Sequence, residues 1–398
     1  MTGPRPPMPR VAVVGGSLGG LTTALHLRDL GCDVAVYERS SSALDARGAG
    51  IAVLDQTLRY PVERAGVSPS TFCSTTAWIR FLHHDGSVQH AQQHPYRFSS
   101  WNAVYRTLLE AFDADRYHLG AEMTSFASGD DAVEVRFADG DPVTADLLVC
   151  ADGVNSTARE QLLPDVTPAY AGYIAWRGTI PEASLSAATY DRLHDALTYQ
   201  LLPHSHILVY PIPGLDGAVA EGQRLMNIVW YRNVAAEALP ALLTDRDGQE
   251  RTVSVPPGMM RDDAVDEMHR YAAANLAPPI AEVVLSISEP FVQAVVDIAV
   301  PRMAEGRACL VGDAAFAVRP HAAAGTAKAA EDGYVLAQEL DAADGDVPTA
   351  LAVWEERQLA LGRSLLERTR EIGDSSQFSG TFRPGDPRLV FGLYEPGG

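Results

Sequence analysis

The chain has 398 residues, of which 46% are hydrophobic and 8% aromatic, enough for two or three lobes with buried cores. Its formal net charge of −20 repels phosphate backbones, so we expect no nucleic-acid partner. No apolar run reaches the length of a membrane span, and the four scattered cysteines show neither disulfide-framework nor zinc-ligand spacing. These features favour a cytoplasmic protein with no membrane partner and no metal site.

The first forty residues predict a strand, a glycine-rich turn, a helix and a second strand. Residues 11–14 form a continuous apolar run, as expected for a strand that is buried on both faces. After the glycines, leucines recur at helical spacing until Gly31, which suits a helix C-terminus, and residues 33–38 form the next strand. A right-handed crossover joins two such strands in a parallel sheet.

Later segments alternate between sheet and helix. Residues 132–149 predict a pair of strands, and the apolar and aromatic runs after residue 170, punctuated by proline and glycine, predict an antiparallel sheet. Residues 305–340 return to strand, turn and helix, and residues 348–373 predict a long amphipathic helix. We therefore predict an α/β fold in which a Rossmann-like nucleotide-binding domain carries an inserted antiparallel-sheet domain.

The predicted domains are discontinuous because the β-rich segments interrupt the nucleotide-binding ones. We expect a nucleotide-binding domain in residues 1–72, 98–168 and 286–373, a β-rich domain in 73–97 and 169–285, and an irregular tail in 374–398. The tail is rich in glycine and proline, which disfavour regular structure.

The glycine-rich turn is the first motif with chemical meaning. Gly15-Gly16-Ser17-Leu18-Gly19-Gly20 leads from a strand into a helix, where the backbone can approach a pyrophosphate and the helix N-terminus faces it. Glu38 ends the second strand, at the position of an acidic residue that binds an adenosine ribose. Ser17 replaces the middle glycine of the fingerprint, and such turns also occur without a ligand. The flanking strands and Glu38 nevertheless favour a dinucleotide site.

An Asp-Gly motif follows the apolar run 147–150. Asp152 and Gly153 predict a turn after a buried strand, and Thr157 with Glu160 predicts a capping box for the next helix. This local structure is expected with or without a ligand. The functional interpretation adds that Asp152 and its turn face a cofactor.

A Gly-Asp motif, Gly312-Asp313, is the third. An aspartate at the C-terminal end of a strand can bind sugar hydroxyls, and the helix opened by Ala324-Gly325-Thr326 can direct its positive end at an anion. Arg319-Pro320-His321 precedes that helix. Taken alone, this segment is also compatible with an ordinary strand-to-helix turn.

Together, the glycine-rich turn near residue 15, Asp-Gly near 152 and Gly-Asp near 312 resemble the flavoprotein aromatic hydroxylases, the para-hydroxybenzoate hydroxylase-like family of FAD monooxygenases. The resemblance covers nearly the whole chain and implies the para-hydroxybenzoate hydroxylase-like fold, with FAD in the Rossmann-like domain and substrate in the β-rich domain. The segments GYIAWRG, LVYPIPG, WYRN and GDAAFAVRPHAAAGTAKAAEDG are most similar to the 2,6-dihydroxypyridine hydroxylase branch, in which GGS in place of GGG is also usual.

The resemblance implies that the three motifs and a few neighbouring residues bind FAD. Glu38 would bind the adenosine ribose, Asp313 the ribityl chain, and the backbone of residues 323–326 would face the flavin ring. Arg106, on a predicted amphipathic helix, would touch the ribityl–phosphate region, although it could equally be a surface charge. The residues implied at the cofactor are Gly15, Ser17, Leu18, Gly20, Glu38, Arg39, Arg47, Arg106, Asp152, Asp313, Ala324, Gly325 and Thr326.

The resemblance also implies the reaction. NADH or NADPH would reduce FAD, molecular oxygen would add to give a flavin hydroperoxide, and one oxygen atom would pass to an electron-rich carbon of a small aromatic or N-heteroaromatic substrate. No second glycine fingerprint for the nicotinamide nucleotide is visible, as in a family whose reductant binds without its own Rossmann domain. The expected assembly is a monomer or a homodimer.

The base that helps to deprotonate a substrate hydroxyl is the least determined part of the site. His321 is the leading candidate because it lies in the loop that approaches the third-motif helix. His204 and His206, two residues apart, are expected on one face of a strand, and Tyr210 and Tyr173 lie in the same β-rich region. We predict His321, His206 and Tyr210 as catalytic residues, with ordinary packing as the alternative for each.

The sequence does not identify the substrate. Residues 73–100 and 170–285 are expected to determine it, and Trp176 and Arg177 either orient it or are structural at the domain junction. One alternative is another FAD-dependent oxidoreductase on the same scaffold, although the G-W-x-W-x-I-P motif of a halogenase is absent. A non-catalytic FAD-binding regulator is a second alternative. An NAD-dependent dehydrogenase is a third, but it leaves Gly312-Asp313 unexplained.

Overall fold

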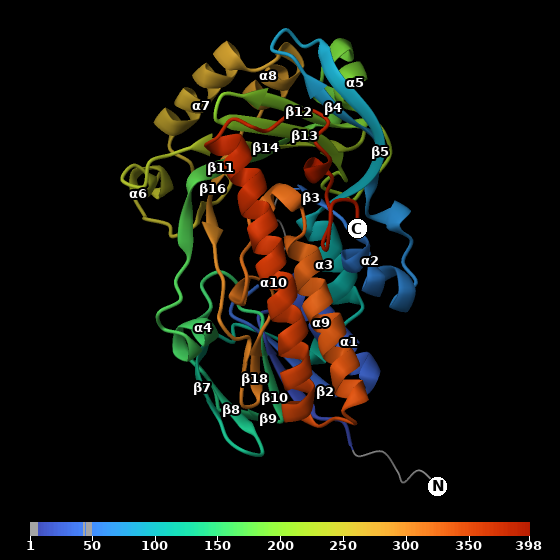
Figure 1. Ribbon diagram of the computed structural model, residues 1–398, viewed down its shortest axis with the longest axis vertical. Helices are drawn as coiled ribbons and strands as arrows, with labels where there is room; N and C mark the ends of the chain where they lie inside the picture. Colours follow the sequence, from blue (N-terminus) through green and yellow to red (C-terminus); the bar gives the residue numbers. More distant parts are fainter. Residues whose placement is uncertain (1–6, 43, 45–49) are drawn as a thin grey trace.

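The computed structural model describes residues 7–42, 44 and 50–398. Figure 1 shows two regions stacked along the long axis of the molecule, each built around its own sheet. Helix α10 (Val347–Gln377) runs beside both regions and so connects them. It begins at Asp346, whose side chain accepts a hydrogen bond from the Thr349 amide, and extends four residues beyond the predicted end.

A six-stranded sheet carries the three motifs. Its strands are, in order across the sheet, β17 (Ala304–Glu305), β18 (Ala308–Leu310), β10 (Leu147–Cys150), β1 (Arg10–Val14), β2 (Asp33–Glu38) and β6 (Tyr117–Leu119). All neighbours are parallel except β17 and β18. The central strands are apolar along their length because one hydrophobic core joins them to helices on the sheet and to a small second sheet.

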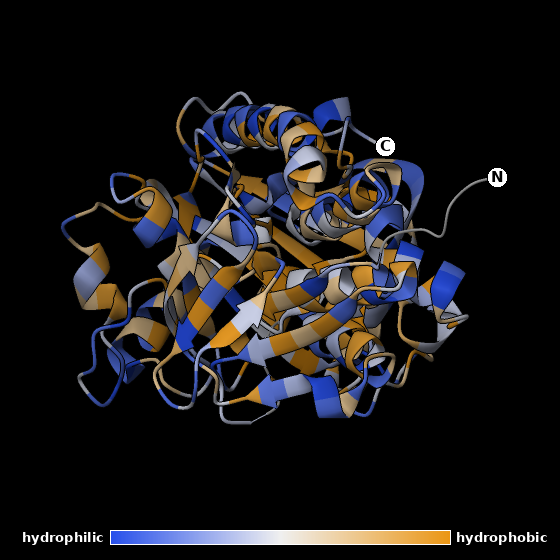
Figure 2. Cartoon of the chain, turned by 90° about the horizontal axis from the view of Figure 1, so that it is seen from below, coloured by the Kyte–Doolittle hydropathy of each residue, from blue (hydrophilic) through white to orange (hydrophobic). Residues whose placement is uncertain are grey.

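Two helices and a three-stranded sheet complete this core. Helices α1 (Leu18–Leu30) and α9 (Gly325–Ala342) pack against each other, and both contribute buried leucines. The three-stranded antiparallel sheet comprises β7 (Met123–Ser128), β8 (Val133–Phe137) and β9 (Val143–Ala145). Figure 2, which looks onto this end of the molecule, shows apolar strands inside a shell of polar loops and helix faces.

A nine-stranded sheet forms the other region. Its order is β15 (Ser254–Val255), β16 (Phe291–Asp297), β11 (Ala169–Pro181), β14 (Leu225–Asn233), β13 (Ser205–Ile212), β12 (Ala196–Leu202), β4 (Ser74–Leu82), β5 (Val88–Ser100) and β3 (Gly50–Ala52). Its neighbours are antiparallel, as predicted, except for β12 and β4. The fold is therefore the predicted α/β arrangement of a parallel nucleotide sheet and a second, largely antiparallel sheet.

The side chains of strand β13 alternate between the two faces of the large sheet, which pack against different parts of the molecule. Ile207 and Val209 pack under helices α7 (Asp262–Asn275) and α8 (Pro278–Leu285). Because side chains alternate along a strand, Leu208 and its neighbours two residues away face the opposite surface, towards the nucleotide sheet. His204 does not belong to this strand: it lies in the turn after β12, with φ of 55°. The prediction that His204 and His206 share one strand face is therefore wrong.

The remaining helices are short and lie around the two sheets. They are α2 (Asp55–Arg59), α3 (Trp101–Glu110), α4 (Thr157–Leu162), α5 (Ala187–Leu193) and α6 (Leu239–Leu243). After α10 the chain contains one short 3₁₀ turn, Pro387–Leu389, and packs back against the large sheet with Phe382, Phe391 and Leu393 buried. Among the helices of the described residues, none is both long and apolar enough to span a membrane.

Candidate active site

One large cleft lies between the two sheets. Its volume is about 420 Å³, and it is lined from both sides. The nucleotide-sheet wall contains residues of all three motifs, including Ser17, Gly153 and Asp313. The opposite wall is built from side chains of the nine-stranded sheet, including Arg177 and Tyr210. The carboxyl ends of β1, β10 and β18 thus meet at one site, as expected for ligand binding by a parallel sheet.

The glycine-rich turn is shaped by backbone contacts that no other residue allows. Gly15 has φ of 99°, and a Cβ atom there would lie 2.2 Å from the carbonyl oxygen of Ala151. A Cβ atom on Gly20 would lie 1.8 Å from the carbonyl oxygen of Gly15. Ser17 begins helix α1 and makes no capping hydrogen bond to the described residues, so the first amides of the helix face the cleft. Leu18 is buried and contributes its backbone there.

Glu38 is oriented by this turn. Its carboxylate accepts hydrogen bonds from the amides of Gly16, at 2.8 Å, and Ser40, at 2.9 Å. Tyr117 donates a hydrogen bond to the carbonyl oxygen of Gly16 at 2.9 Å, which fixes the other side of the same residue. A carboxylate has further lone pairs, so Glu38 can also accept from ribose hydroxyls.

Two of the three arginines predicted at the cofactor do not line the cleft. Arg39 and Arg106 are exposed and are not among the described residues that line the cleft. Arg47 lies outside the described residues. Contact of these three side chains with FAD therefore stays a prediction.

The Asp-Gly turn reaches the cleft through Gly153, whereas Asp152 is not among the described residues that line it. Asp152 accepts from the Ala158 amide at 3.2 Å with one oxygen, while its other oxygen is buried without a partner among the described residues. Burial raises the pKa of this carboxyl. The predicted capping box is wrong by one residue, because Ser156 is the N-cap of α4 and accepts from the Arg159 amide at 2.9 Å. The turn itself forms as predicted.

The Gly-Asp turn is held by a buried ion pair. Lys328, the only lysine in the sequence, lies 2.7 Å from Asp332, and both side chains are buried. The same Asp332 oxygen accepts from the Gly312 amide at 2.8 Å, so the pair fixes the start of the turn. The neighbouring Asp313 opens into the cleft. Desolvation raises the pKa of the Asp313 carboxyl, and the charge of Lys328 opposes that rise.

The N-terminus of helix α9 completes this wall. Gly325 and Thr326 line the cleft, whereas Ala324 is buried behind them. The helix has no side-chain cap among the described residues, so its first amides are available to an anionic group. Turns that exclude Cβ atoms, two helix N-termini without side-chain caps and the Asp313 carboxylate together fit a dinucleotide with a pyrophosphate and sugar hydroxyls.

A hydrogen-bonded group of residues on the sheet wall centres on Arg177. Its guanidinium donates to the carbonyl oxygen of Gly50 at 2.6 Å and to Gln293 Oε1 at 3.2 Å, while its Nε is buried without a partner among the described residues. Tyr210, one of the predicted catalytic residues, also donates to the Gly50 carbonyl oxygen at 3.0 Å. The proton of Tyr210 is thus already engaged, and burial raises the pKa of this phenol.

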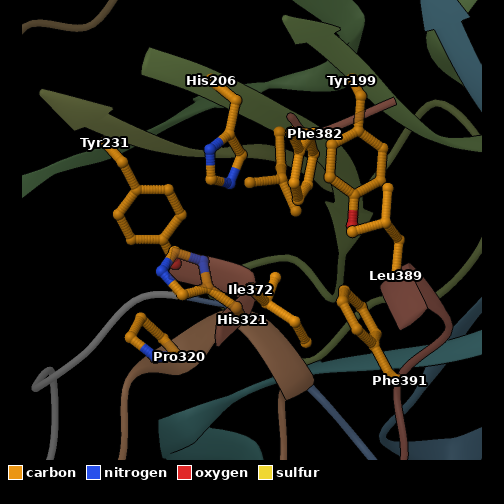
Figure 3. Close-up of a pocket in the computed structure, with 10 residues that line it drawn as sticks. Tyr199, His206, Tyr231, Pro320, His321, Ile372, Phe382, Leu389 and Phe391 are labelled. Atoms are coloured by element: carbon orange, nitrogen blue, oxygen red, sulfur yellow. The ribbon is translucent and has the colours of Figure 1, made fainter. Parts of the chain in front are cut away.

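The two predicted catalytic histidines line a second, smaller cavity of about 10 Å³ (Figure 3). His206 and His321 line it, and the cavity shares Leu208, Tyr231, Pro320 and Phe391 with the large cleft. Burial lowers the pKa of His206 to about 3 and holds the pKa of His321 well below its usual value. Both rings are therefore neutral near pH 7, and neither lines the large cleft itself.

Comparison with known proteins identifies the family. The chain is 38% identical over 392 residues to 2,6-dihydroxypyridine 3-monooxygenase of Paenarthrobacter nicotinovorans, a match that covers 98% of this chain and 96% of the relative. The chain belongs to the flavoprotein aromatic hydroxylase family. It is thus an FAD-dependent monooxygenase, and the predicted family, fold and cofactor are confirmed.

Further comparisons agree with this assignment. The structure of 2,6-dihydroxypyridine-3-hydroxylase from Arthrobacter nicotinovorans matches with a TM-score of 0.92 and 36% identity over 98% of each chain. The 6-hydroxynicotinate 3-monooxygenase of Pseudomonas fluorescens is 28% identical over 354 residues, which cover 83% of this chain and 82% of the relative. A family described as FAD binding domain-like matches residues 170–297, most of which belong to the nine-stranded sheet and its helices.

Several residues of the site were not predicted from sequence. Gln293 and Phe391 line the cleft, and Lys328 holds the Gly-Asp turn. Lys328 had one available signal, because a single lysine in a chain of this length is unusual. Gln293 is the one polar residue inside the apolar segment 291–296, which also singles it out. Phe391 carries no such signal in the sequence.

Proposed function

We propose that the enzyme consumes NADH or NADPH and adds one oxygen atom to a small N-heteroaromatic ring that carries hydroxyl groups. Two relatives described above are named for such rings, 2,6-dihydroxypyridine and 6-hydroxynicotinate. The observation that carries the proposal is Arg177, whose buried Nε lacks a partner among the described residues at the edge of a cleft with aromatic walls. A cation there suits a ring whose hydroxyl has ionised, which is also the form that donates electrons most readily to an oxidant.

In this proposal FAD lies along the nucleotide-sheet wall. Its pyrophosphate is held by the amides that follow Ser17, its adenosine ribose by Glu38 and its ribityl hydroxyls by Asp313. The backbone of residues 323–326 faces the flavin ring. Reduced FAD supplies the activation of molecular oxygen when it is bound. The chain itself binds the ring, orients it and excludes water from the cleft.

The sheet wall then positions the substrate. Arg177, which Gly50 and Gln293 hold in place, attracts the ionised oxygen of the ring. Tyr210 fixes the same Gly50 carbonyl oxygen and contributes its aromatic face. His206 and His321 act from the adjoining cavity. A cytoplasmic monomer or homodimer stays our prediction for the assembled enzyme.

The test is substrate-stimulated oxidation of NADH and NADPH by the FAD-loaded enzyme. A panel of 2,6-dihydroxypyridine, 6-hydroxynicotinate, salicylate and phenol would be followed by oxygen uptake and product mass. We expect a hydroxylated pyridine to accelerate oxidation most and to gain one oxygen atom. Acceleration without oxygen in the product would contradict the hydroxylation, and preference for a phenol would contradict the heteroaromatic class. A protein that holds FAD but oxidises neither nucleotide with any of these rings would instead be a non-catalytic regulator.

A further inference from the structure

The small cavity beside the cleft is lined by two histidines whose hydrogen-bonding states can be deduced. His206 comes from β13 and His321 from the loop before α9, and their ring centroids lie 5.4 Å apart. Figure 3 shows the two rings on opposite sides of the cavity, pointing towards one another. Both side chains are more than nine-tenths buried. A cavity of about 10 Å³ holds one water-sized atom or group.

The tautomer of His321 follows from its contact with Tyr173. The Tyr173 hydroxyl lies 2.7 Å from His321 Nε2, and the Arg319 guanidinium lies over the Tyr173 ring, 5.7 Å from its centroid. A guanidinium has no acceptor, and among the described residues His321 Nε2 is the acceptor within reach of the Tyr173 proton. Tyr173 therefore donates to Nε2, and the ring proton of neutral His321 is on Nδ1.

The Nδ1 atom of His321 is buried and has no hydrogen-bond partner among the described residues. A buried N–H group without an acceptor is costly, so native proteins nearly always supply one. Nδ1 is on the side of the ring away from the Nε2–Tyr173 contact. The structure thus contains a buried donor, on a residue that lines the cavity, that has no acceptor among the described residues.

His206 has the opposite tautomer. Its Nδ1 lies 2.5 Å from Ser376 Oγ and 3.3 Å from Gln377 Nε2, both at the end of α10. The Gln377 amide group also donates to Ser376 Oγ, at 3.0 Å, which leaves the serine proton for His206. Because both neighbours donate to Nδ1, the ring proton of His206 is on Nε2. The cavity therefore has a second N–H donor.

Helix α10 leaves room for this arrangement at Gly373. A Cβ atom there would lie 2.6 Å from the Tyr173 hydroxyl, 2.9 Å from His321 Nε2 and 3.1 Å from Arg319 Nη1. A glycine inside a helix costs stability relative to alanine, so its presence has a steric reason here. Arg319 is itself fixed by ion pairs with Asp297, at 3.0 Å, and Asp374, at 2.7 Å. The orientation of His321 is thus held from several sides.

We propose that His206 and His321 form a two-donor subsite for one oxygen atom of the substrate, a carbonyl or ionised hydroxyl oxygen distinct from the one near Arg177. The proposal rests on the proposed function, because it assigns a second ring oxygen to the same substrate. Two converging N–H donors select an atom with lone pairs and no proton of its own. The subsite would make the enzyme prefer rings with two oxygen substituents over rings with one.

The first test measures the tautomers directly. Enzyme labelled with ¹⁵N-histidine would be examined by NMR with FAD bound and no substrate, and H206Q and H321N variants would assign the two signals. We expect a proton on Nδ1 of His321 and on Nε2 of His206. The reverse tautomer of either ring removes a donor from the cavity and overturns the proposal.

The second test measures binding without turnover. Calorimetry of the FAD-loaded enzyme, with no NADH or NADPH present, would compare 2,6-dihydroxypyridine with 2-hydroxypyridine. We expect wild type to prefer the first ring, and H321L and H206L each to reduce that preference about tenfold, the effect of one hydrogen bond to a strong acceptor. Affinity for 2-hydroxypyridine should stay unchanged in these variants.

Conservative variants distinguish the loss of a hydrogen-bond donor from a change in packing. The amide of H321N places a donor near the Nδ1 position, and that of H206Q places one near Nε2, so both should retain most of the preference. G373A should reduce it without removing any polar atom. If both rings bind and the leucine variants leave the preference intact, the subsite alone is overturned. If neither ring binds wild type, the proposed substrate class fails and the subsite fails with it.

Discussion

The two walls of the cleft are built in different ways. The nucleotide-sheet wall consists of backbone turns, each directly after a parallel strand, and its requirements are steric, as at Gly15 and Gly20. The opposite wall consists of single side chains from distant parts of the chain, such as Arg177 on β11 and Gln293 on β16. The first wall is built from contiguous motifs, whereas the second can change one residue at a time; in our proposal the first wall binds the cofactor and the second selects the substrate.

The largest expected effect is on the backbone wall. G15A forces an L-residue into φ of 99° and places its Cβ atom 2.2 Å from the Ala151 carbonyl oxygen, a contact that backbone atoms cannot relieve. We expect no measurable FAD binding in a fluorescence-quenching titration of the apoenzyme. Gly66 is the matched control, since it has φ of 68° but a Cβ atom there would have no neighbour within 4 Å among the described residues. G66A should cost only about 1 kcal/mol of stability and leave FAD affinity unchanged.

Equal loss of FAD binding in G15A and G66A would show that the positive φ alone, and not the close approach of residue 15 to Ala151, is what makes the substitution harmful. Wild-type affinity in G15A would remove the steric basis that we assign to the backbone wall.

The same difference explains what the sequence could predict. Glu38 and Gly312-Asp313 were found because a buried strand and its turn are adjacent in sequence; Gly312-Asp313 lines the cleft, and Glu38 is hydrogen-bonded to the glycine-rich turn beside it. The Arg177–Gly50–Gln293 group could not be found, because its residues are far apart in the sequence and β3, which carries Gly50, is not a neighbour of β11 in the sheet. His204 was misplaced for a related reason: a two-residue turn and a strand have similar composition here, and only the turn geometry separates them.

An effect of intermediate size is expected on the pH dependence of the free energy of unfolding, through a buried histidine behind the backbone wall. His26 on α1 is buried, and burial together with Arg59 lowers its pKa from 6.5 to about 4; Arg64 acts in the same direction and Asp29 opposes it. As pH falls from 6.5 to 4, the unfolded chain takes up a proton that folded His26 refuses. The free energy of unfolding therefore falls with pH, by up to about 3 kcal/mol from this group.

Urea denaturation of the FAD-loaded enzyme at about pH 7.5, 6 and 5 would measure this loss. H26Q should be less stable at the highest pH, because Tyr60 and Tyr334 pack against the imidazole edge-on, but its stability should fall less on acidification. An unchanged pH slope in H26Q would assign the acid sensitivity to other groups, of which His206 in the small cavity beside the cleft is the first to examine.

The smallest expected effect concerns the C-terminal tail, which extends the sheet wall. The Phe391 ring lies 4.8 Å from the Tyr96 ring and lines both the large cleft and the small cavity, and its amide donates to the Tyr96 hydroxyl at 2.9 Å. Arg368 holds the next two carbonyl oxygens of the tail. Phe391 therefore lines the part of the cleft that adjoins the small cavity.

F391A should raise KM for the ring substrate about tenfold, the effect of losing part of one buried aromatic contact, while kcat and FAD affinity change little. Y394A is the control from the same tail, since that side chain is 53% exposed and is not among the described residues that line the cleft. Steady-state kinetics and FAD titration of both variants make the comparison. A fall in FAD affinity in F391A would mean that the tail supports both walls. The backbone wall, which we assign to the cofactor, and the side-chain wall, which we assign to the substrate, would then both depend on residue 391.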